Sequence, residues 1–445
     1  MKIRFFIIIF FSFLNCTVET FDNWPENNKI FSGELIWIKN FGGSNEDVAH
    51  SIIETSDGGI AILGNTMSID GMISDKILPE RDFWFLKLNS DGEILINKTF
   101  GGSGDDRGQS LLEMSDGGFL LIGYSKSSDG DGSKNEGQHD NWIIRINNNG
   151  DLLWEKSIGF SGHDHAYSII KTLDGGFFMS GFLDVTASNG EGNIGKGLNT
   201  RHGVGEFWGH KLDSQGQIMW SRFFGGTNND RSYDVVETKN GDFILVGSTE
   251  SNDVDISKNY GSYDYWVIKI DRRGELIWEK TFGGSGIDVA NSIERLPNNN
   301  FLILGYSFSS DFQRIESIGE SDFWLLEIDG AGNLIKDLSF GGNLYDSGQD
   351  ICKGPSGSYF LTGYSQSNNG DVYSNSGSND VVVFHISPIG IIFKSIILGG
   401  SKSDLGYSSV FSSSGNLYVV GTSESNDGDF SKPYGGKDFF VAKYN

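Results

Sequence analysis

Acidic side chains recur at the same place in successive segments of this chain, and carboxylates can bind cations, transfer protons or accept hydrogen bonds from backbone amides. One set, the connector carboxylates, stands a few residues after a glycine-rich tetrad: Asp47, Asp106, Asp164, Asp230, Asp288, Asp346 and Asp404. A second set, the third-strand carboxylates, opens an apolar run that we assign below to a third strand: Asp82, Asp140, Glu206, Asp264, Asp322, Asp380 and Asp438. A short carboxylate beside a Gly-Gly connector most often caps backbone N–H groups. We therefore expect a mainly structural role, and the alternative is an acidic rim that binds cations.

Three loops place aspartates two residues apart, as in one half of a calcium-binding loop. The pairs are Asp129 and Asp131, Asp253 and Asp255, and Asp427 and Asp429. Alternate oxygen ligands suit Ca²⁺, which takes roughly six to eight of them. None of these loops carries the distal glutamate of an EF-hand. The pairs are therefore either Ca²⁺ sites or solvated turns, and the sequence indicates no other cofactor.

Histidines concentrate in one part of the chain. His139, His163, His165 and His202 are four of its seven histidines, and His202 lies in an insertion from Asp184 to Gly205. Imidazole nitrogens coordinate Zn²⁺ and other transition metals. The spacing matches no established metal motif, so surface histidines without a metal are the alternative. We predict that this sector is the candidate ligand site.

Catalytic signatures are missing from the sequence, which has no GxSxG elbow, no P-loop and no HExxH motif. Carboxylate pairs for glycoside hydrolysis could be drawn from many positions, because a pattern repeated along the chain singles out no one pair. The sequence therefore favours a protein that is not an enzyme. If it is one, the histidine sector is the only centre that we can suggest.

The elements that must position these residues are repeated seven times. An FGGS-like tetrad begins each repeat at Phe41, Phe100, Ile158, Phe224, Phe282, Phe340 and Leu398, with spacings of 58 or 59 residues except for 66 in the third repeat. Within one repeat, short apolar or alternating runs occur at 110–113, 119–122, 142–146 and 152–156. Runs of this length and period indicate strands. Each repeat is therefore predicted to contain four strands.

The turns between these strands favour hairpins. Asp116-Gly117-Gly118 and its copies supply residues that tolerate the left-handed backbone of a tight turn. Repeats of four short antiparallel strands predict an all-β fold, a seven-bladed β-propeller. The last repeat stops after its third strand, whereas residues 33–40 match the fourth strand of other repeats and precede the first tetrad. We expect residues 33–40 to complete the seventh blade and close the ring, which leaves no free edge.

Large aromatic residues recur at two strand positions. Third strands carry Trp84, Trp142, Trp208, Trp266 and Trp324, and fourth strands carry Trp37, Trp154, Trp220 and Trp278. Side chains of this size at a fixed register most simply fill the space between neighbouring sheets. Apart from Cys16 the only cysteine is Cys352, so a monomer contains no disulfide and packing must stabilise the ring.

Composition restricts the partners. The formal net charge is −25 and the pI is about 4.6, so the chain would be repelled by a phosphate backbone and we exclude nucleic acid as a partner. The repeat makes residues 33–445 one domain, which we expect to be a monomer.

The N-terminal residues are typical of an export signal. Lys2 and Arg4 precede an apolar run from Phe5 to Phe13, which is too short to span a bilayer. Residues 1–15 followed by Cys16 resemble a bacterial lipoprotein signal, in which the cysteine is lipidated, and residues 16–32 would form a tether. The alternative is an ordinary secretory signal, with Cys16 incidental.

The segments FGGSGDD (100–106), SDGGFLLIGYS (115–125), DNWIIRI (140–146) and NGDLLWEK (149–156) together resemble a repeat of bacterial lipoproteins and secreted β-propellers. Such proteins are often labelled lipoprotein or bulb-type lectin-domain protein. The resemblance covers residues 33–445 and implies the propeller architecture. The mannose motif of bulb-type lectins, QxDxNxVxY, does not occur in this chain.

These observations predict a lipid-anchored, non-catalytic binding scaffold of the bacterial cell envelope, at the outer membrane or cell surface. Its partner would be a protein or a glycan on one face of the ring. A glycan-binding module is the alternative, with the loop aromatics Tyr260, Tyr263 and Phe312 as stacking platforms. A hydrolase is a third possibility.

Overall fold

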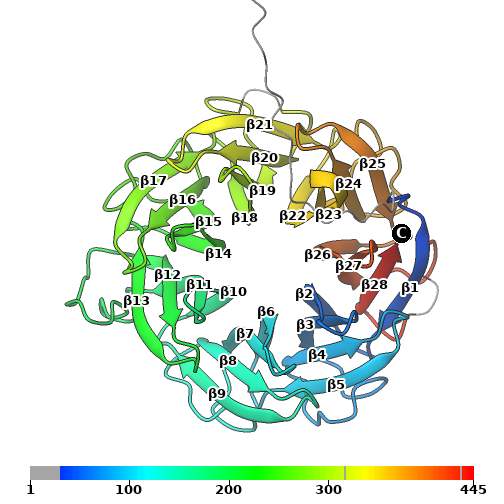
Figure 1. The fold of residues 1–445 in the computed structure, drawn as a ribbon, viewed down its shortest axis with the longest axis horizontal. Helices are drawn as coiled ribbons and strands as arrows, with labels where there is room; N and C mark the ends of the chain where they lie inside the picture. The colour runs from blue at the N-terminus through cyan, green and yellow to red at the C-terminus, as the bar shows by residue number, and fades with distance from the viewer. Residues whose placement is uncertain (1–30, 315–316, 431–432) are drawn as a thin grey trace, which may run out of the picture.

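The computed structural model of the protein describes residues 31–314, 317–430 and 433–445. In these residues, strands β1 to β28 form seven four-stranded antiparallel sheets arranged around a central axis (Figure 1). This arrangement confirms the predicted all-β fold, a seven-bladed β-propeller. A short 3₁₀ turn, Pro355–Gly357, joins two strands of the sixth blade.

The strands occupy four positions in each blade, and blades 1 to 7 are numbered in chain order from the blade that begins with β2. The innermost strands are β2 (Asp47–Glu54), β6 (Asp106–Glu113), β10 (His165–Lys171), β14 (Asp230–Glu237), β18 (Asp288–Arg295), β22 (Asp346–Lys353) and β26 (Asp404–Phe411). The second strands are β3 (Ile60–Thr66), β7 (Phe119–Ser125), β11 (Phe177–Asp184), β15 (Phe243–Thr249), β19 (Phe301–Ser307), β23 (Tyr359–Ser365) and β27 (Leu417–Ser423). The third strands are β4 (Asp82–Leu88), β8 (Asp140–Ile146), β12 (Val204–Leu212), β16 (Asp264–Ile270), β20 (Asp322–Ile328), β24 (Asp380–Ile386) and β28 (Asp438–Tyr444). The outermost strands are β5 (Ile94–Phe100), β9 (Leu152–Ile158), β13 (Ile218–Phe224), β17 (Leu276–Phe282), β21 (Leu334–Phe340), β25 (Ile392–Leu398) and β1 (Leu35–Phe41).

The core lies between neighbouring blades. Every residue of β7 and β8 is buried, because both faces of a middle strand are covered by adjacent sheets. Trp142 of blade 2 is 1% exposed and packs against Phe83 of blade 1, with ring centroids 5.0 Å apart. The third-strand tryptophans therefore fill the space between blades, as the sequence predicts.

The outer-strand tryptophans have a different structural role. A Cβ atom on Gly216, in a turn of blade 3, would lie 2.7 Å from the ring of Trp154 in blade 2. Gly274 is placed in the same way against Trp220. Each of these tryptophans covers the turn of the next blade, so they also pack blade against blade.

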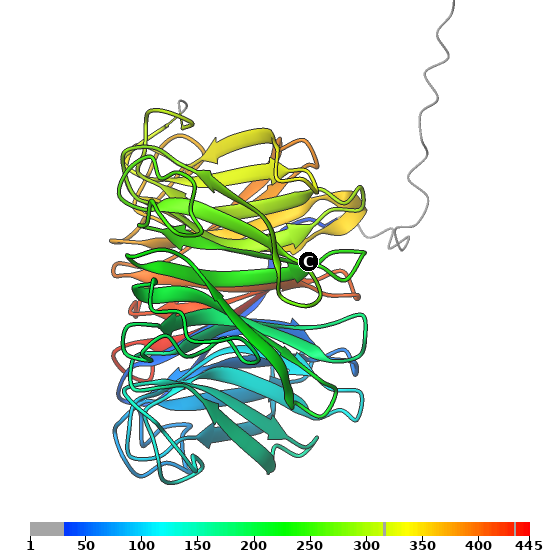
Figure 2. The same cartoon turned by 90° about the vertical axis from the view of Figure 1, so that its left-hand side faces the viewer.

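The ring has two unlike faces, which Figure 2 shows from the side. One face, called the turn face, carries the tight turns between first and second strands and between third and fourth strands. The opposite face, called the loop face, carries the tetrad connectors and the longer loops between second and third strands. Short backbone bridges such as His139–His163 and Tyr263–Ile287 join adjacent blades on the loop face.

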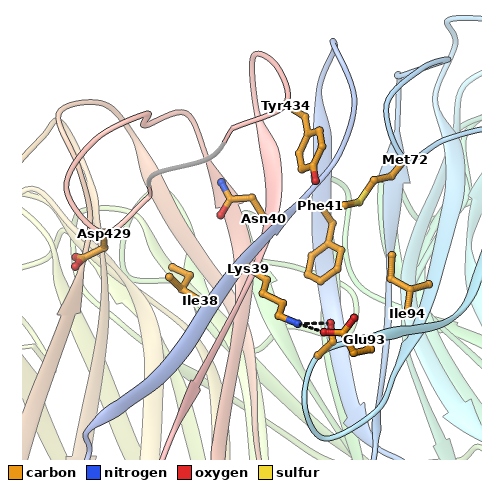
Figure 3. Close-up of a pocket in the computed structure, with 10 residues that line it drawn as sticks. Ile38, Lys39, Asn40, Phe41, Met72, Glu93, Ile94, Asp429 and Tyr434 are labelled. Atoms are coloured by element: carbon orange, nitrogen blue, oxygen red, sulfur yellow. Dashed lines mark hydrogen bonds and ion pairs between the residues drawn. The ribbon is translucent and has the colours of Figure 1, made fainter.

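The two ends of the described chain meet in blade 7. Strand β1 pairs antiparallel with β28, from Leu35 opposite Tyr444 to Phe41 opposite Phe439. This pairing confirms that the N-terminal strand closes the ring. Lys39 of β1 then reaches blade 1, where its Nζ lies 2.7 Å from Glu93 Oε1 (Figure 3).

The chain joins the ring on the turn face. Ser32 and Gly33 donate backbone hydrogen bonds of 2.8 and 2.6 Å to the carbonyl of Asn445. Phe31 packs edge-on against Phe360, with centroids 4.9 Å apart. The predicted signal peptide 1–15, Cys16 and most of the tether 16–32 lie outside the described residues. Within the part that the structure describes, no helix has the length and apolar character needed to cross a membrane.

Removal of residues 33–40 should lower the melting temperature sharply, because β28 loses its partner and blade 7 exposes a sheet edge. A synthetic peptide of residues 33–41 should restore part of the loss, whereas a scrambled peptide should not. Differential scanning calorimetry measures both effects. An unchanged melting curve after the deletion would contradict closure by this strand.

Candidate functional site

The connector carboxylates are buried and bind the connector between blades. Asp106 Oδ2 accepts a hydrogen bond from the Gly102 amide at 2.9 Å and from Ser127 Oγ at 2.7 Å, while its Oδ1 accepts one from Ser125 Oγ at 2.5 Å. Blades 1, 4, 5, 6 and 7 repeat these three contacts, with threonine in place of the first serine in blades 1 and 4. These contacts favour the structural role over a cation-binding rim.

Blade 3 departs from this pattern. Its connector carboxylate, Asp164, accepts only backbone hydrogen bonds among the described contacts, from Phe160 at 2.6 Å and Asp184 at 3.0 Å. Burial raises the pKa of Asp164 to about 7. The repeat is therefore modified at the blade that also carries the insertion and two of the clustered histidines.

The third-strand carboxylates lie beside the connector carboxylates of the next blade. Asp380 Oδ2 accepts a hydrogen bond from the Ser376 amide at 2.7 Å, but within the described residues its buried Oδ1 has no hydrogen-bond partner. Burial raises the pKa of Asp380 to about 6, and the carboxylates of Asp404 and Asp429 add to the effect. Similar buried oxygens occur on Asp140, Asp264 and Asp438.

Within the described residues, three blades place a basic side chain beside this carboxylate. Lys76 Nζ lies 3.1 Å from Asp82, Arg314 lies 2.7 Å from Asp322, and His202 Nδ1 lies 3.1 Å from Glu206. His202 is thus a buried partner of Glu206. The structure does not bring His202 together with the other three histidines of the predicted sector, because its ring lies against Glu206 and Phe223 of blade 3.

The aspartates of the predicted calcium loops also accept hydrogen bonds from connectors. Asp129 Oδ1 accepts one from the Ser103 amide at 2.8 Å, and Asp131 Oδ2 accepts one from the Gly101 amide at 3.1 Å. The pairs Asp253 and Asp255, and Asp427 and Asp429, make equivalent contacts. A cavity of about 300 Å³ between blades 1 and 2 is lined by Asp82, Asp129 and Asp131. Calcium binding stays a prediction.

The remaining histidines of the predicted sector meet on the loop face, between blades 2 and 3. We call His139, His163 and His165 the histidine cluster, because one ring nitrogen from each lies within 4.8 Å of the others. His139 Nδ1 and His163 Nδ1 are 2.9 Å apart. The ring of His165 is stacked on the ring of Tyr124, with centroids 3.7 Å apart. It also contacts the ring of Phe182, with centroids 4.6 Å apart.

Burial favours the neutral form of His163 and His165. Burial, together with the two neighbouring histidines, lowers the pKa of His165 to about 2, and burial also lowers the pKa of His163. Asp105 Oδ2 lies 3.8 Å from His139 Nε2 and is itself bound by Arg107 Nη2 at 2.7 Å. A neutral imidazole can donate a lone pair to a ligand or metal.

An aromatic lining around the axis was not predicted from the sequence. The residue three positions after a connector carboxylate is His50 in blade 1, Tyr167 in blade 3, Tyr233 in blade 4 and Tyr407 in blade 7. Neighbouring members touch, with ring centroids 5.3 Å apart for Tyr167 and Tyr233 and 5.5 Å apart for His50 and Tyr407. The signal was available as a column of the repeat, but only the ring shows that this column faces the axis.

Two of the three predicted glycan-stacking residues lie close together. Tyr260 and Phe312 have ring centroids 5.9 Å apart, and Phe312 is 61% exposed. Lys258 Nζ lies 3.9 Å from the centre of the Tyr260 ring. The hydroxyl of Tyr263 instead donates to Glu250 at 3.2 Å.

A cavity of about 620 Å³ lies where β1 meets blade 1 (Figure 3). Its walls include Phe41, Met72, Ile94 and Tyr434, beside the Lys39–Glu93 ion pair. The described residues that line this cavity include no cluster of histidines and no paired acids, so it offers less chemistry than the histidine cluster.

No known protein family matches this chain, and no curated protein matches it. Among solved structures, the WD40 domain of Neurospora crassa Pan2 is similar, with 9% identity, a TM-score of 0.48 and 89% of each chain covered. Puromycin hydrolase has 9% identity and a TM-score of 0.47 over 86% of this chain and 51% of that chain. Drosophila Plexin A, in complex with Semaphorin 1b, has 9% identity and a TM-score of 0.43 over 94% of this chain and 88% of that chain. Similarity at this level concerns the fold alone.

The third-strand carboxylates should make the protein less stable as the pH rises. A carboxyl whose pKa is raised by folding binds its proton more tightly in the folded state, so its contribution is complete below the unfolded pKa and is lost as the pH rises through the folded pKa. For Asp380 that window runs from 3.8 to about 6. Asp380→Asn should therefore raise stability at pH 8 by on the order of 1 to 2 kcal/mol and change it little at pH 4.

Urea unfolding at the two pH values measures this difference. Asp427→Asn is the matched control, because its exposed carboxylate has a pKa lowered by hydrogen bonds from Ser401 and should gain nothing at pH 8. A loss of stability for Asp380→Asn at pH 8 would contradict the assignment.

Proposed function

We propose that this protein is a lipid-anchored binding scaffold of the bacterial cell envelope, related to the lipoproteins and secreted propellers that its repeats resemble. In this proposal Cys16 carries the lipid, residues 16–32 form the tether, and the loop face binds the partner. The protein performs no reaction of its own.

The position at which the chain joins the ring supports this arrangement. Phe31 packs on the turn face, beside Phe360 and Phe411. A tether of residues 16–32 spans at most about 60 Å when fully extended. An anchor attached there enters the ring on the turn face and leaves the loop face accessible to a partner.

The observation that carries the binding role is the convergence of side chains on the loop face near the axis. The histidine cluster lies there, and Tyr306, Phe308 and Tyr345 form a second aromatic group with centroid distances of 5.6 to 6.3 Å. Phe308 is 42% exposed. Exposed aromatic residues on a rigid scaffold are common anchors of protein interfaces.

Glycan binding is the second candidate, and the pair formed by Tyr260 and Phe312 favours it. The exposed Phe312 ring and the half-buried Tyr260 ring, beside Lys258, can stack on a sugar and hydrogen-bond its hydroxyls. A glycan array separates the two functions, since Phe312→Ala would abolish glycan signals whereas Phe393→Ala, which removes a ring that is also 61% exposed, would not.

Lipidation is tested on Cys16. The wild-type protein should incorporate labelled palmitate and enter the detergent phase on Triton X-114 partitioning, whereas Cys16→Ser should do neither. Cys352→Ser is the matched control and should behave like the wild type, because this thiol lies within blade 6. Equal partitioning of wild type and Cys16→Ser would rule out the anchor.

Partner binding is tested with the ring of residues 31–445, without its anchor, used as bait on envelope extracts. Phe308→Ala should lower recovery of the specific partner at least tenfold, because it removes an exposed aromatic group from the loop face. Leu173→Ala changes a residue that is 70% exposed on the turn face and should recover the partner normally. If only Leu173→Ala lost binding, the interface would lie on the turn face, which would contradict the proposal.

A further inference from the structure

We propose that the histidine cluster is a transition-metal site that takes Zn²⁺, with His139, His163 and His165 as its three protein ligands. The proposal goes beyond the binding scaffold, since a metal can occupy this site whether or not a partner is bound.

The backbone already brings the three residues together. His163 and His165 flank the buried Asp164, and alternate residues of an extended chain point to the same side. His139 is in backbone bridge contact with His163, and its carbonyl accepts a 2.7 Å hydrogen bond from the Asp164 amide. The ligands therefore come from two adjacent blades that are fixed to each other.

The ring nitrogens are close to the spacing that a metal requires. Zinc–nitrogen bonds of about 2.0–2.1 Å in a tetrahedron separate the nitrogens by roughly 3.4 Å. One nitrogen from each histidine already lies within 4.8 Å of the others. A small rotation of the exposed His163 ring would shorten its nitrogen–nitrogen distances toward the value in a zinc site.

Two buried ring nitrogens in the cluster make no hydrogen bond. Within the described residues, Nε2 of His139 and Nε2 of His165 have no hydrogen-bond partner. Buried polar atoms without partners are uncommon in folded proteins. A bound metal would use Nε2 of His165. Asp105 Oδ2 lies 3.8 Å from His139 Nε2, where it can accept a hydrogen bond from that N–H when His139 binds the metal through Nδ1.

The donor set selects the metal. Three imidazole nitrogens suit Zn²⁺, Ni²⁺ or Cu²⁺, whereas Ca²⁺ and Mg²⁺ prefer oxygen ligands. Three protein ligands leave a fourth position open, toward the solvent-exposed side of His163. The nearby cations include Lys126, Arg107, which is paired with Asp105, and Arg231, which lies 4.8 Å from the centre of the Phe182 ring. They favour water or an anion as the fourth ligand.

The other histidines are committed elsewhere. His202 contacts Glu206, His210 contacts Ser221 at 2.7 Å, and His385 contacts Ser358 at 2.8 Å. His50 Nε2 lies 3.1 Å from Asn65 Nδ2. His50 is therefore a matched control, since it also faces the axis but belongs to no cluster.

The experiment titrates ZnCl₂ into the metal-free ring of residues 31–445 by isothermal titration calorimetry. The metal content of the protein is then measured after gel filtration. We expect about one Zn²⁺ per chain for the wild type and for His50→Gln. His163→Ala should weaken binding at least 100-fold, while its metal-free melting temperature stays that of the wild type, because this side chain is exposed.

Co²⁺ spectra and competition with Ca²⁺ test the site further. Co²⁺ should give the visible absorption bands of a four-coordinate site in the wild type, and His139→Gln should abolish them. CaCl₂ should neither bind at this site nor displace Zn²⁺. No heat with Zn²⁺, equal affinity in His163→Ala, or displacement by Ca²⁺ would each overturn the proposal.

Discussion

The ring depends on carboxylates that are buried without full charge compensation. Each connector must cross from the outermost strand of one blade to the innermost strand of the next, and its backbone N–H groups would otherwise lose their hydrogen bonds to water. A connector carboxylate supplies the acceptor, and two hydroxyls at the end of the second strand bind its other lone pairs. An unpaired buried amide costs more than the hydrogen bond is worth when made, so this contact fixes the connector and with it the angle between blades.

The same arrangement explains the glycines of the tetrad. A Cβ atom on Gly101 would lie 2.4 Å from Asp82 Oδ1 and 2.9 Å from Asp106 Oδ2, because carboxylates of two blades close on this residue from both sides. Blade 3 is the exception. Without the two hydroxyls its connector relies on backbone donors, and this is where the histidine cluster occurs. Departures from a local pattern often coincide with functional residues.

Most of the fold could be predicted from the sequence, because the repeat displays the same strand and turn chemistry in every copy. The four strands, the hairpin turns, the buried tryptophans and closure by the N-terminal strand all follow from residues such as Trp142, Gly117 and Trp37. The site could be predicted only in part. Spacing along the chain placed His163 beside His165, but whether His139 or His202 joins them depends on blade geometry and on the path of the insertion. The aromatic lining of the axis was missed for the same reason.

Closure by strands from opposite ends of the chain also sets the order in which the protein can fold. Among the described strands, β1 is synthesised first and its partner β28 last. Blades 1 to 6 can each form from contiguous sequence, whereas blade 7 must wait until β28 has been synthesised. Pairing across about 400 residues has a large loop-closure cost and is slow. A translation product truncated before β28 therefore never acquires a closed ring, and its exposed sheet edge distinguishes it from the closed ring for proteases and chaperones.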